Sequence, residues 1–213
     1  MMMVVGLTGG SGVGKTTLCQ ALEQLQIPSL NTDLLSRAVT TPGTPCLSEL
    51  IEFFGTGILR ADGTLNRRRL AQMVFGEEDE HRRAEKQARL NAVTHKYILA
   101  ACGTWLAAQR AAGAELVVID APLLFESGFD RQCDVTVGVV SHKELRIARI
   151  TERDDISQSA AETRIAAQLD DAALRARCDY ILENNGTQQA FEHAAKTLFS
   201  ELRARAVAAG CAQ

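Results

Sequence analysis

The sequence predicts an α/β protein built on a parallel, doubly wound sheet. Two observations predict it. Apolar, β-rich segments alternate with stretches of helical periodicity, and a glycine-rich loop joins the first apolar segment to the first helical stretch. Strands that alternate with helices form parallel sheets with right-handed crossovers. Such sheets bind ligands beyond the carboxyl ends of their strands, which is where the glycine-rich loop is expected.

The expected strands are short and apolar, and they are residues 4–8, 27–31, 115–119, 135–140 and 180–182. The third and fourth are nearly continuous apolar runs, which is typical of strands that helices cover on both faces. The last is the weakest, and the turn signal Asn184-Asn185-Gly186 follows it. A parallel, five-stranded sheet is therefore expected.

The expected helices are residues 15–25, about 65–112, about 142–178 and about 187–209. In the first of them, Leu18, Leu22 and Leu25 recur on one face. Two excursions, residues 42–90 and 141–178, are too long to be simple crossovers. Their many charges are typical of a solvated helical face, but in a nucleotide enzyme such excursions also form a substrate lobe and a closing lid.

Length and composition favour one compact domain. A chain of 213 residues buries a sizeable core without disulfides or metals. A net charge of −3 and an aromatic content of 5% argue against a nucleic-acid-binding protein. The six cysteines are scattered without metal-binding spacing, so we expect reduced thiols and no fixed metal site. No signal peptide, membrane span or membrane partner is expected, which makes the cytoplasm the expected location.

The glycine-rich loop carries a specific phosphate-binding motif. Residues 9–17 read Gly-Gly-Ser-Gly-Val-Gly-Lys-Thr-Thr, which satisfies G-x-x-x-x-G-K-[ST] from Gly9 to Thr16. The glycines allow successive N–H groups to point inward at a helix N-terminus, where they bind phosphate oxygens. Lys15 then reaches the β- and γ-phosphates, and the Thr16 hydroxyl is a ligand for Mg²⁺. The residues expected to bind ATP are Gly10, Ser11, Gly12, Val13, Gly14, Lys15, Thr16 and Thr17.

Two aspartates follow expected strands. Asp33 comes just after the second strand, where a carboxylate accepts a proton from a substrate hydroxyl that attacks the γ-phosphate. The alternative is that Asp33 caps a following helix, and position alone does not decide between the two. Asp120 follows the most apolar strand, where an acidic residue holds Mg²⁺ directly or through water, or merely caps the strand end.

Arginines at helical spacing are the candidates for neutralising phosphate charge. Arg146, Arg149 and Arg153 recur at steps of three and four residues, so they share one helix face. Planar guanidinium groups suit the equatorial oxygens of a phosphoryl group in transfer. An exposed face paired with neighbouring acids is the alternative, and the same ambiguity holds for Arg67 and the two arginines that follow it.

Taken together, these segments resemble the dephospho-CoA kinase family over nearly the whole chain. The resemblance is carried by residues 6–10 with the phosphate loop, Thr32-Asp33, Phe54-Gly55, residues 62–67 with Leu70 and Phe75, Leu90-Asn91 with His95, Pro122-Leu123-Leu124-Phe125-Glu126, Arg149, Arg153-Asp154, Arg164-Ile165 with Gln168, and Asp179 through Gly186. The phosphate loop is shared by very many families, whereas the Pro-Leu-Leu-Phe-Glu segment and its ordered neighbours are far more specific.

The resemblance implies transfer of the ATP γ-phosphate to the ribose 3′-hydroxyl of dephospho-CoA, by a monomer or weak homo-oligomer. It implies a P-loop NTPase three-layer fold with a core of about residues 1–40, 113–140 and 179–213, a CoA-binding helical lobe over about 60–112, and a lid over about 141–178. It places Lys15, Asp33, Arg149 and Arg153 in catalysis and Thr16 and Asp120 at Mg²⁺. It also places Asp33, Arg67, His95, Pro122, Leu123 and Glu126 at the substrate.

The chain departs from the family pattern at three positions. Ser11 and Val13 stand where the family loop usually has Ile and Ser, and Lys96 follows His95 where a proline is usual. The fixed glycines and the lysine of the loop are kept, so ATP binding is expected to survive. The alternatives are another small-molecule or nucleotide P-loop kinase and a P-loop switch, although the Asn-Lys-x-Asp segment of guanine-binding switches is absent from the sequence.

Overall fold

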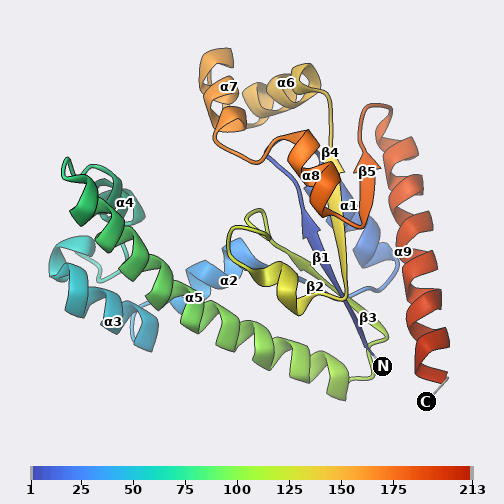
Figure 1. The fold of residues 1–213 in the computed structure, drawn as a ribbon, viewed down its shortest axis with the longest axis horizontal. Helices are drawn as coiled ribbons and strands as arrows, with labels where there is room; N and C mark the ends of the chain where they lie inside the picture. The colour runs from blue at the N-terminus through green and yellow to red at the C-terminus, as the bar shows by residue number, and fades with distance from the viewer. Residues whose placement is uncertain (1, 212–213) are drawn as a thin grey trace. The chain divides into compact units, whose positions relative to one another are not determined.

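The computed structural model of the protein describes residues 2–211 and contains one five-stranded sheet (Figure 1). The strands are β1 (Met3–Thr8), β2 (Ser29–Asn31), β3 (Leu116–Asp120), β4 (Val135–Val140) and β5 (Tyr180–Glu183). They pair in the order β2-β3-β1-β4-β5, and all four pairings are parallel. The predicted α/β class with a parallel, five-stranded sheet is confirmed.

The central strands are buried on both faces, as their apolar sequences predict. Every residue of β3 and β4 is buried, so side chains of both alternating sets meet helices rather than water. In the register, Leu7 of β1 lies opposite Asp120 of β3 and Val137 of β4. The carboxyl ends of the strands therefore lie at one edge of the sheet, where the phosphate loop leaves β1.

Two compact units divide the chain. The first unit comprises residues up to Asn31 and from Ala108 onward, and it contains the sheet. Its helices are α1 (Lys15–Gln24), α6 (Lys143–Asp154), α7 (Gln158–Ala166), α8 (Asp171–Arg177) and α9 (Gln188–Cys211), with the short helix η2 (Phe129–Gln132). Helices α1 and α9 pack together (Figure 1), and Leu18, Leu22, Phe199 and Leu202 join the strands in one apolar core.

The second unit, Thr32–Ala107, has a core of its own. It holds α2 (Thr32–Val39), α3 (Pro45–Phe54), η1 (Thr56–Ile58), α4 (Arg67–Phe75) and most of α5 (Glu80–Ala111). Leu47, Leu50, Ile58, Val74 and Val93 are buried together in it. The expected lobe began at about residue 60, whereas this compact unit begins at Thr32 and so includes α2 and α3.

Local capping divides two of the expected helical stretches into separate helices. The stretch 65–112 is α4 and α5, because Gly76 ends α4 and the Asp79 side chain accepts a hydrogen bond from the Arg82 N–H at the start of α5. The stretch 142–178 is three helices. The side chains of Ser157 and Asp170 cap α7 and α8 in the same way.

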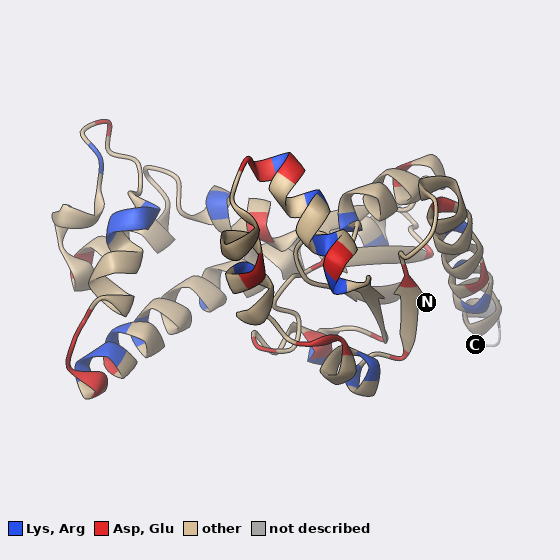
Figure 2. Cartoon of the chain, turned by 90° about the horizontal axis from the view of Figure 1, so that it is seen from above, with Lys and Arg blue, Asp and Glu red and all other residues tan. Residues whose placement is uncertain are grey.

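The amino-terminal turns of α5 carry acidic and basic side chains intermixed (Figure 2). Lys86 Nζ lies 2.5 Å from Glu77 Oε2, and Arg83 lies 3.4 Å from Glu80. These pairs support the interpretation of this charged stretch as a solvated helical face. In the part of the chain that the structure describes, no helix combines the length and apolarity that crossing a bilayer requires.

Candidate active site

The phosphate loop connects Thr8, the last residue of β1, to Lys15, the first residue of α1. Gly12 has φ 78° and Gly14 has φ 100°, in the left-handed region that L side chains rarely adopt. A Cβ at Gly12 would lie 2.7 Å from the Arg146 carbonyl oxygen, and one at Gly14 would overlap the Asn184 side chain. Both glycines are therefore required by conformation and by space.

Three consecutive carbonyls of the loop are bound by side chains that lie far away in the sequence. The Ser11 carbonyl accepts a hydrogen bond from Arg146 Nε (3.0 Å), the Gly12 carbonyl from Arg149 Nη1 (3.2 Å) and the Val13 carbonyl from Asn184 Nδ2 (2.8 Å). In a trans peptide the C=O and N–H groups point in opposite directions. The N–H groups of the three following residues therefore point away from these side chains, as a phosphate-binding nest requires.

The loop lysine lies beside the strand-end carboxylate. Lys15 Nζ donates to the Gly9 carbonyl at 2.6 Å and lies 3.9 Å from Asp120 Oδ1. Asp120 is 5% exposed, and its Oδ2 accepts a hydrogen bond from Asn31 Nδ2 at 2.9 Å. The start of α1 and the end of β3 thus hold a cation and an anion side by side next to the loop, which is the charge pattern of a nucleotide–metal site.

The first turn of α1 continues this site. Thr16 and Thr17 follow Lys15 directly, and the Thr16 side chain is exposed. One turn further on, Cys19 carries a raised pKa of about 11, chiefly because of burial and then because of the negative charge of Asp120. This thiol is consequently neutral at physiological pH.

The two arginines expected in catalysis have different surroundings. Besides the Gly12 carbonyl, Arg149 donates to Ser141 Oγ (3.1 Å) and to the Asn184 carbonyl (3.2 Å). Arg153 instead makes two hydrogen bonds to Asp154, at 2.7 and 2.9 Å, and its side chain is 59% exposed. Arg153 and Arg164, which also binds Asp154, hold the pKa of that carboxyl well below its usual range.

The Pro-Leu-Leu-Phe-Glu segment forms a turn directly after β3. The Pro122 carbonyl accepts a hydrogen bond from Thr8 Oγ1 at 3.3 Å, and the Leu124 side chain is fully buried. The Phe125 ring lies 4.1 Å from the Arg177 guanidinium, at cation–π distance. Anchored in this way, the turn presents the exposed side chains of Leu123 and Glu126 at the carboxyl edge of the sheet.

A second candidate site lies within the unit Thr32–Ala107. It is a pocket of about 260 Å³ whose lining includes Ser36, Thr40, Arg67, Phe75, Asn91 and Thr94. Arg67 Nη2 donates to Thr40 Oγ1 at 2.5 Å. The pKa of Arg67 is lowered, first by burial and then by the charges of Arg37 and Arg60. An arginine that lines a pocket in an excess of positive charge suits an anionic group of a ligand.

The other two acceptor-site candidates are on the same unit. Asp33 is the second residue of α2, in its first turn, and its side chain is exposed. Ser36, three residues further along α2, lines the pocket, so Asp33 lies on the side of α2 that meets the pocket. His95 lies on α5 beside the lining residue Thr94 and does not itself line this pocket.

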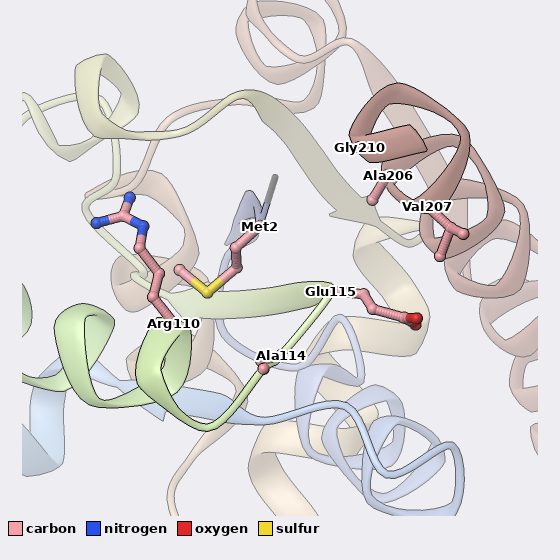
Figure 3. A pocket seen from close by; sticks show the side chains of 8 residues that line it. Met2, Arg110, Ala114, Glu115, Ala206, Val207 and Gly210 are labelled. Atoms are coloured by element: carbon pink, nitrogen blue, oxygen red, sulfur yellow. The ribbon is translucent and has the colours of Figure 1, made fainter. Parts of the chain in front are cut away.

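A larger pocket, of about 470 Å³, lies at the other end of the sheet (Figure 3). Its lining includes Met2, Arg110, Glu115 and Val207. Met2 precedes β1 and Glu115 precedes β3, so this pocket lies at the amino ends of the strands. The phosphate loop leaves β1 at the opposite end, and the size of a pocket therefore does not identify the nucleotide site here.

Two residues that contact the phosphate loop had no assigned role in the sequence analysis. Gln168 and Asn184 both make hydrogen bonds to the loop, as does Arg146, which was one of the candidate phosphate-neutralising arginines. Gln168 and Asn184 were part of the family resemblance, but only the folded chain brings them to the loop across 157 and 171 residues of sequence. No signal in the local sequence predicts contacts at such separations.

Comparisons with known proteins agree with this geometry. The family model of dephospho-CoA kinase matches residues 3–190. The dephospho-CoA kinase of Anaeromyxobacter dehalogenans is 36% identical over 95% of this chain and 93% of its own length, and that of Corynebacterium glutamicum is 37% identical over 96% and 99%.

Solved structures show the same likeness. A crystal structure from Thermus thermophilus is 30% identical, with a TM-score of 0.79 over 94% of this chain and 98% of its own. The dephospho-CoA kinase from Campylobacter jejuni has a TM-score of 0.69 at 22% identity, over 95% of this chain and 98% of its own, and it supports the fold alone.

Proposed function

The chain belongs to the dephospho-CoA kinase family, and from that premise we propose how its residues carry out the reaction. The activity of this chain is transfer of the γ-phosphoryl group of ATP to the ribose 3′-hydroxyl of dephospho-CoA, which gives CoA and ADP. One observation carries the proposal furthest. Side chains bind three consecutive carbonyls of the phosphate loop, which turns the N–H groups of the following residues away from those side chains and supports a role for these N–H groups in anion binding.

The loop binds the triphosphate of ATP. The main-chain N–H groups of residues 10–17 and the N-terminus of α1 donate to its phosphate oxygens. The Lys15 ammonium then contacts the β- and γ-phosphates in place of the Gly9 carbonyl. Since this charge sits where negative charge develops during transfer, it lowers the barrier rather than only tightening binding.

Mg²⁺ is proposed at Thr16 and Asp120. A hydroxyl and a carboxylate fit this cation, which takes oxygen ligands and keeps one or two protein contacts beside phosphate oxygens. The buried Asp120 carboxylate, next to the loop lysine, is the observation that supports this fit. When bound, the cation neutralises charge on the phosphates.

Asp33 is proposed as the general base. Its carboxylate takes the proton from the 3′-hydroxyl as that oxygen forms a bond to the γ-phosphorus, and the bond from the γ-phosphorus to the oxygen that bridges it to the β-phosphate breaks, which releases ADP. The placement of Asp33 on the same side of α2 as the pocket-lining Ser36 supports an acceptor-binding role. Arg67 in the neighbouring pocket supplies positive charge for the anionic part of the substrate.

The remaining site residues are proposed as follows. Arg149 and Arg153 supply positive charge to the phosphates during transfer, Arg149 from its position on the Gly12 carbonyl. Pro122, Leu123, Glu126 and His95 contact dephospho-CoA. The segment 141–178 acts as a lid that excludes water, which otherwise competes with the hydroxyl for the phosphoryl group. We propose a monomer or weak homo-oligomer in the cytoplasm.

A coupled ADP-release assay tests this function. Mg-ATP is supplied with dephospho-CoA, adenosine, AMP or no acceptor, and the product mass is checked for one added phosphate. ADP release that requires dephospho-CoA, with CoA as product, is expected. Release with another acceptor would indicate a different small-molecule kinase, and release without any acceptor would indicate a nucleotide switch.

The Asp33→Asn variant tests the base. It keeps the size of the side chain but removes the proton acceptor, so turnover should fall by at least about a hundredfold while ATP affinity stays the same. Asp130→Asn, an acid on η2 outside the proposed site, is the matched control. Unchanged turnover in Asp33→Asn would remove Asp33 from this role.

A further inference from the structure

Gln168 makes a hydrogen-bonded contact with the phosphate loop that the proposed reaction does not use. The Ser11 N–H donates to Gln168 Oε1 at 2.8 Å, and Gln168 Nε2 lies 3.3 Å from Ser11 Oγ. Gln168 belongs to the short link between α7 and α8, within the segment expected as a lid. An amide oxygen on a main-chain N–H of this loop takes the kind of position that a phosphate oxygen takes.

Arg146 holds this glutamine in place. Its Nη2 donates to Gln168 Oε1 at 3.2 Å, its Nε donates to the Ser11 carbonyl at 3.0 Å, and its Nη1 lies 3.4 Å from Asp171 Oδ1. Arg146 is only 4% exposed, so its guanidinium is fixed by these partners and by packing. One arginine therefore binds both the loop and the side chain that rests on the loop.

The side chains of Gln168 and Arg146 leave no room for a side chain at Gly10. A Cβ at Gly10 would lie 2.7 Å from Gln168 Oε1 and would overlap the Arg146 guanidinium. The loop residue that faces this pair is thus a glycine. The Gln168 oxygen reaches the Ser11 N–H because of that space.

We propose that Gln168 is a positioning residue that competes with the triphosphate of ATP for the Ser11 N–H. Its side-chain oxygen keeps this donor ordered until a phosphate oxygen replaces it. Replacement releases the link between α7 and α8 from the loop, so that nucleotide binding and the position of the lid segment are coupled. This proposal rests on the proposed function only in taking ATP as the ligand of the loop.

Release of Gln168 also changes what Arg146 offers to a ligand. Its Nε and Nη1 groups keep their partners on Ser11 and Asp171, which preserves the orientation of the guanidinium. The Nη2 group loses Gln168 as its partner. A charge-assisted hydrogen bond to phosphate is stronger than one to an amide oxygen, which favours the exchange once ATP arrives.

ATP affinity of two Gln168 variants tests the proposal. Gln168→Ala removes the whole side chain, and Gln168→Met keeps its length without the carbonyl oxygen. Dissociation constants for ATP are measured by calorimetry on the full chain, without acceptor. Because each variant removes the competitor, both should bind ATP about two- to tenfold more tightly than the unaltered protein.

Gln158→Ala is the matched control, since this exposed glutamine on α7 donates a hydrogen bond to Glu162 on the same helix. It should leave the ATP dissociation constant unchanged. Thermal melting without nucleotide identifies variants that fail to fold, and the less damaging of the two Gln168 variants then decides. A residue that merely stabilises the loop would leave ATP affinity unchanged or weaken it on removal, and either result would overturn the proposal.

The same measurements separate this proposal from the proposed function. Tight ATP binding by the unaltered protein without dephospho-CoA-dependent ADP release would overturn the proposed function. The ATP dissociation constants of the Gln168 variants would still support or refute the competition by Gln168. Absence of ATP binding by the unaltered protein would overturn both.

Discussion

The Lys15 side chain is held in position by neighbouring groups. Its ammonium is bound by the Gly9 carbonyl and lies 3.9 Å from the buried Asp120 carboxylate. These neighbours keep the charge at the mouth of the loop. A lysine without these neighbours would lose more side-chain conformational entropy when it binds a phosphate.

The variant Lys15→Ala should lose turnover, because the proposed role of Lys15 is to supply positive charge to the γ-phosphoryl group. We expect kcat to fall by about 10²- to 10³-fold, as for removal of one donor at a site of developing negative charge. Steady-state kinetics with saturating Mg-ATP and dephospho-CoA measure this. Lys196→Ala, on α9, is the control and should keep full turnover; equal losses in both variants would refute the role of Lys15.

Arg149→Ala separates two roles of one arginine. Its guanidinium bridges the Gly12 carbonyl, Ser141 and Asn184, so its removal loosens the loop as well as removing charge. We expect kcat to fall more than ATP affinity, because the effect appears mainly where the loop must match the transition state. Arg175→Ala, whose partner is Glu183, is the control. A larger loss of ATP affinity than of kcat would instead indicate a ground-state binding role.

At the scale of helices, the contacts of Lys96 explain why the chain tolerates a lysine where the family usually has a proline. It lies inside the continuous helix α5, where a proline would remove a backbone donor. Its Nζ donates to Glu49 Oε2 at 3.0 Å, and the Tyr97 hydroxyl donates to the same oxygen at 3.0 Å. The Glu49 carboxylate thereby links α3 to α5 through two hydrogen bonds, and α5 continues without the turn that a proline favours.

This link predicts a pH dependence. The hydrogen bonds from Lys96 and Tyr97 lower the pKa of Glu49 below its ordinary value of 4.5. A lowered folded-state pKa stabilises the fold above that ordinary value, and the stabilisation is lost as the pH falls through the folded value. Glu49→Gln should therefore lower Tm by about 1–3 °C at pH 7 and by less at pH 4.

Melting curves of both proteins across this pH range provide the measurement. Glu52→Gln, on an exposed part of the same helix, is the matched control. A difference in Tm that stays constant from pH 7 to pH 4 would show that the Glu49 charge does not stabilise the fold.

At the scale of the whole molecule, the chain folds as two units, each with its own apolar core. The phosphate loop and its partners belong to the unit with the sheet, and Asp33 and the Arg67 pocket belong to Thr32–Ala107. Nucleotide and acceptor functions are thus proposed to depend on different cores. Trp105, the single tryptophan, belongs to the second unit.

Two core variants test this division. Ile58→Ala, in the core of Thr32–Ala107, should destabilise its own unit by about 2–5 kcal/mol and lower the urea midpoint of Trp105 fluorescence more than that of ATP binding. Leu202→Ala, in the core beneath the sheet, should do the opposite. Equal shifts of both signals in both variants would show that the two units unfold as one.

Much of the architecture was predictable from local pattern. The apolar runs predicted all five strands within two residues at each end, since strands buried on both faces require such runs. Helix boundaries within charged stretches were predicted less well. They depend on capping by Asp79, Ser157 and Asp170, and these side chains are equally common in turns.

The sequence by itself determined the family, the phosphate loop and the chemistry at its ends, because the loop is a contiguous motif that acts through its own backbone. Tertiary structure alone decided which residues bind that loop from outside. Arg146, Arg149, Gln168 and Asn184 reach it from more than 130 residues away. Such contacts depend on the order in which strands pair in the sheet, and local patterns carry no information about that order.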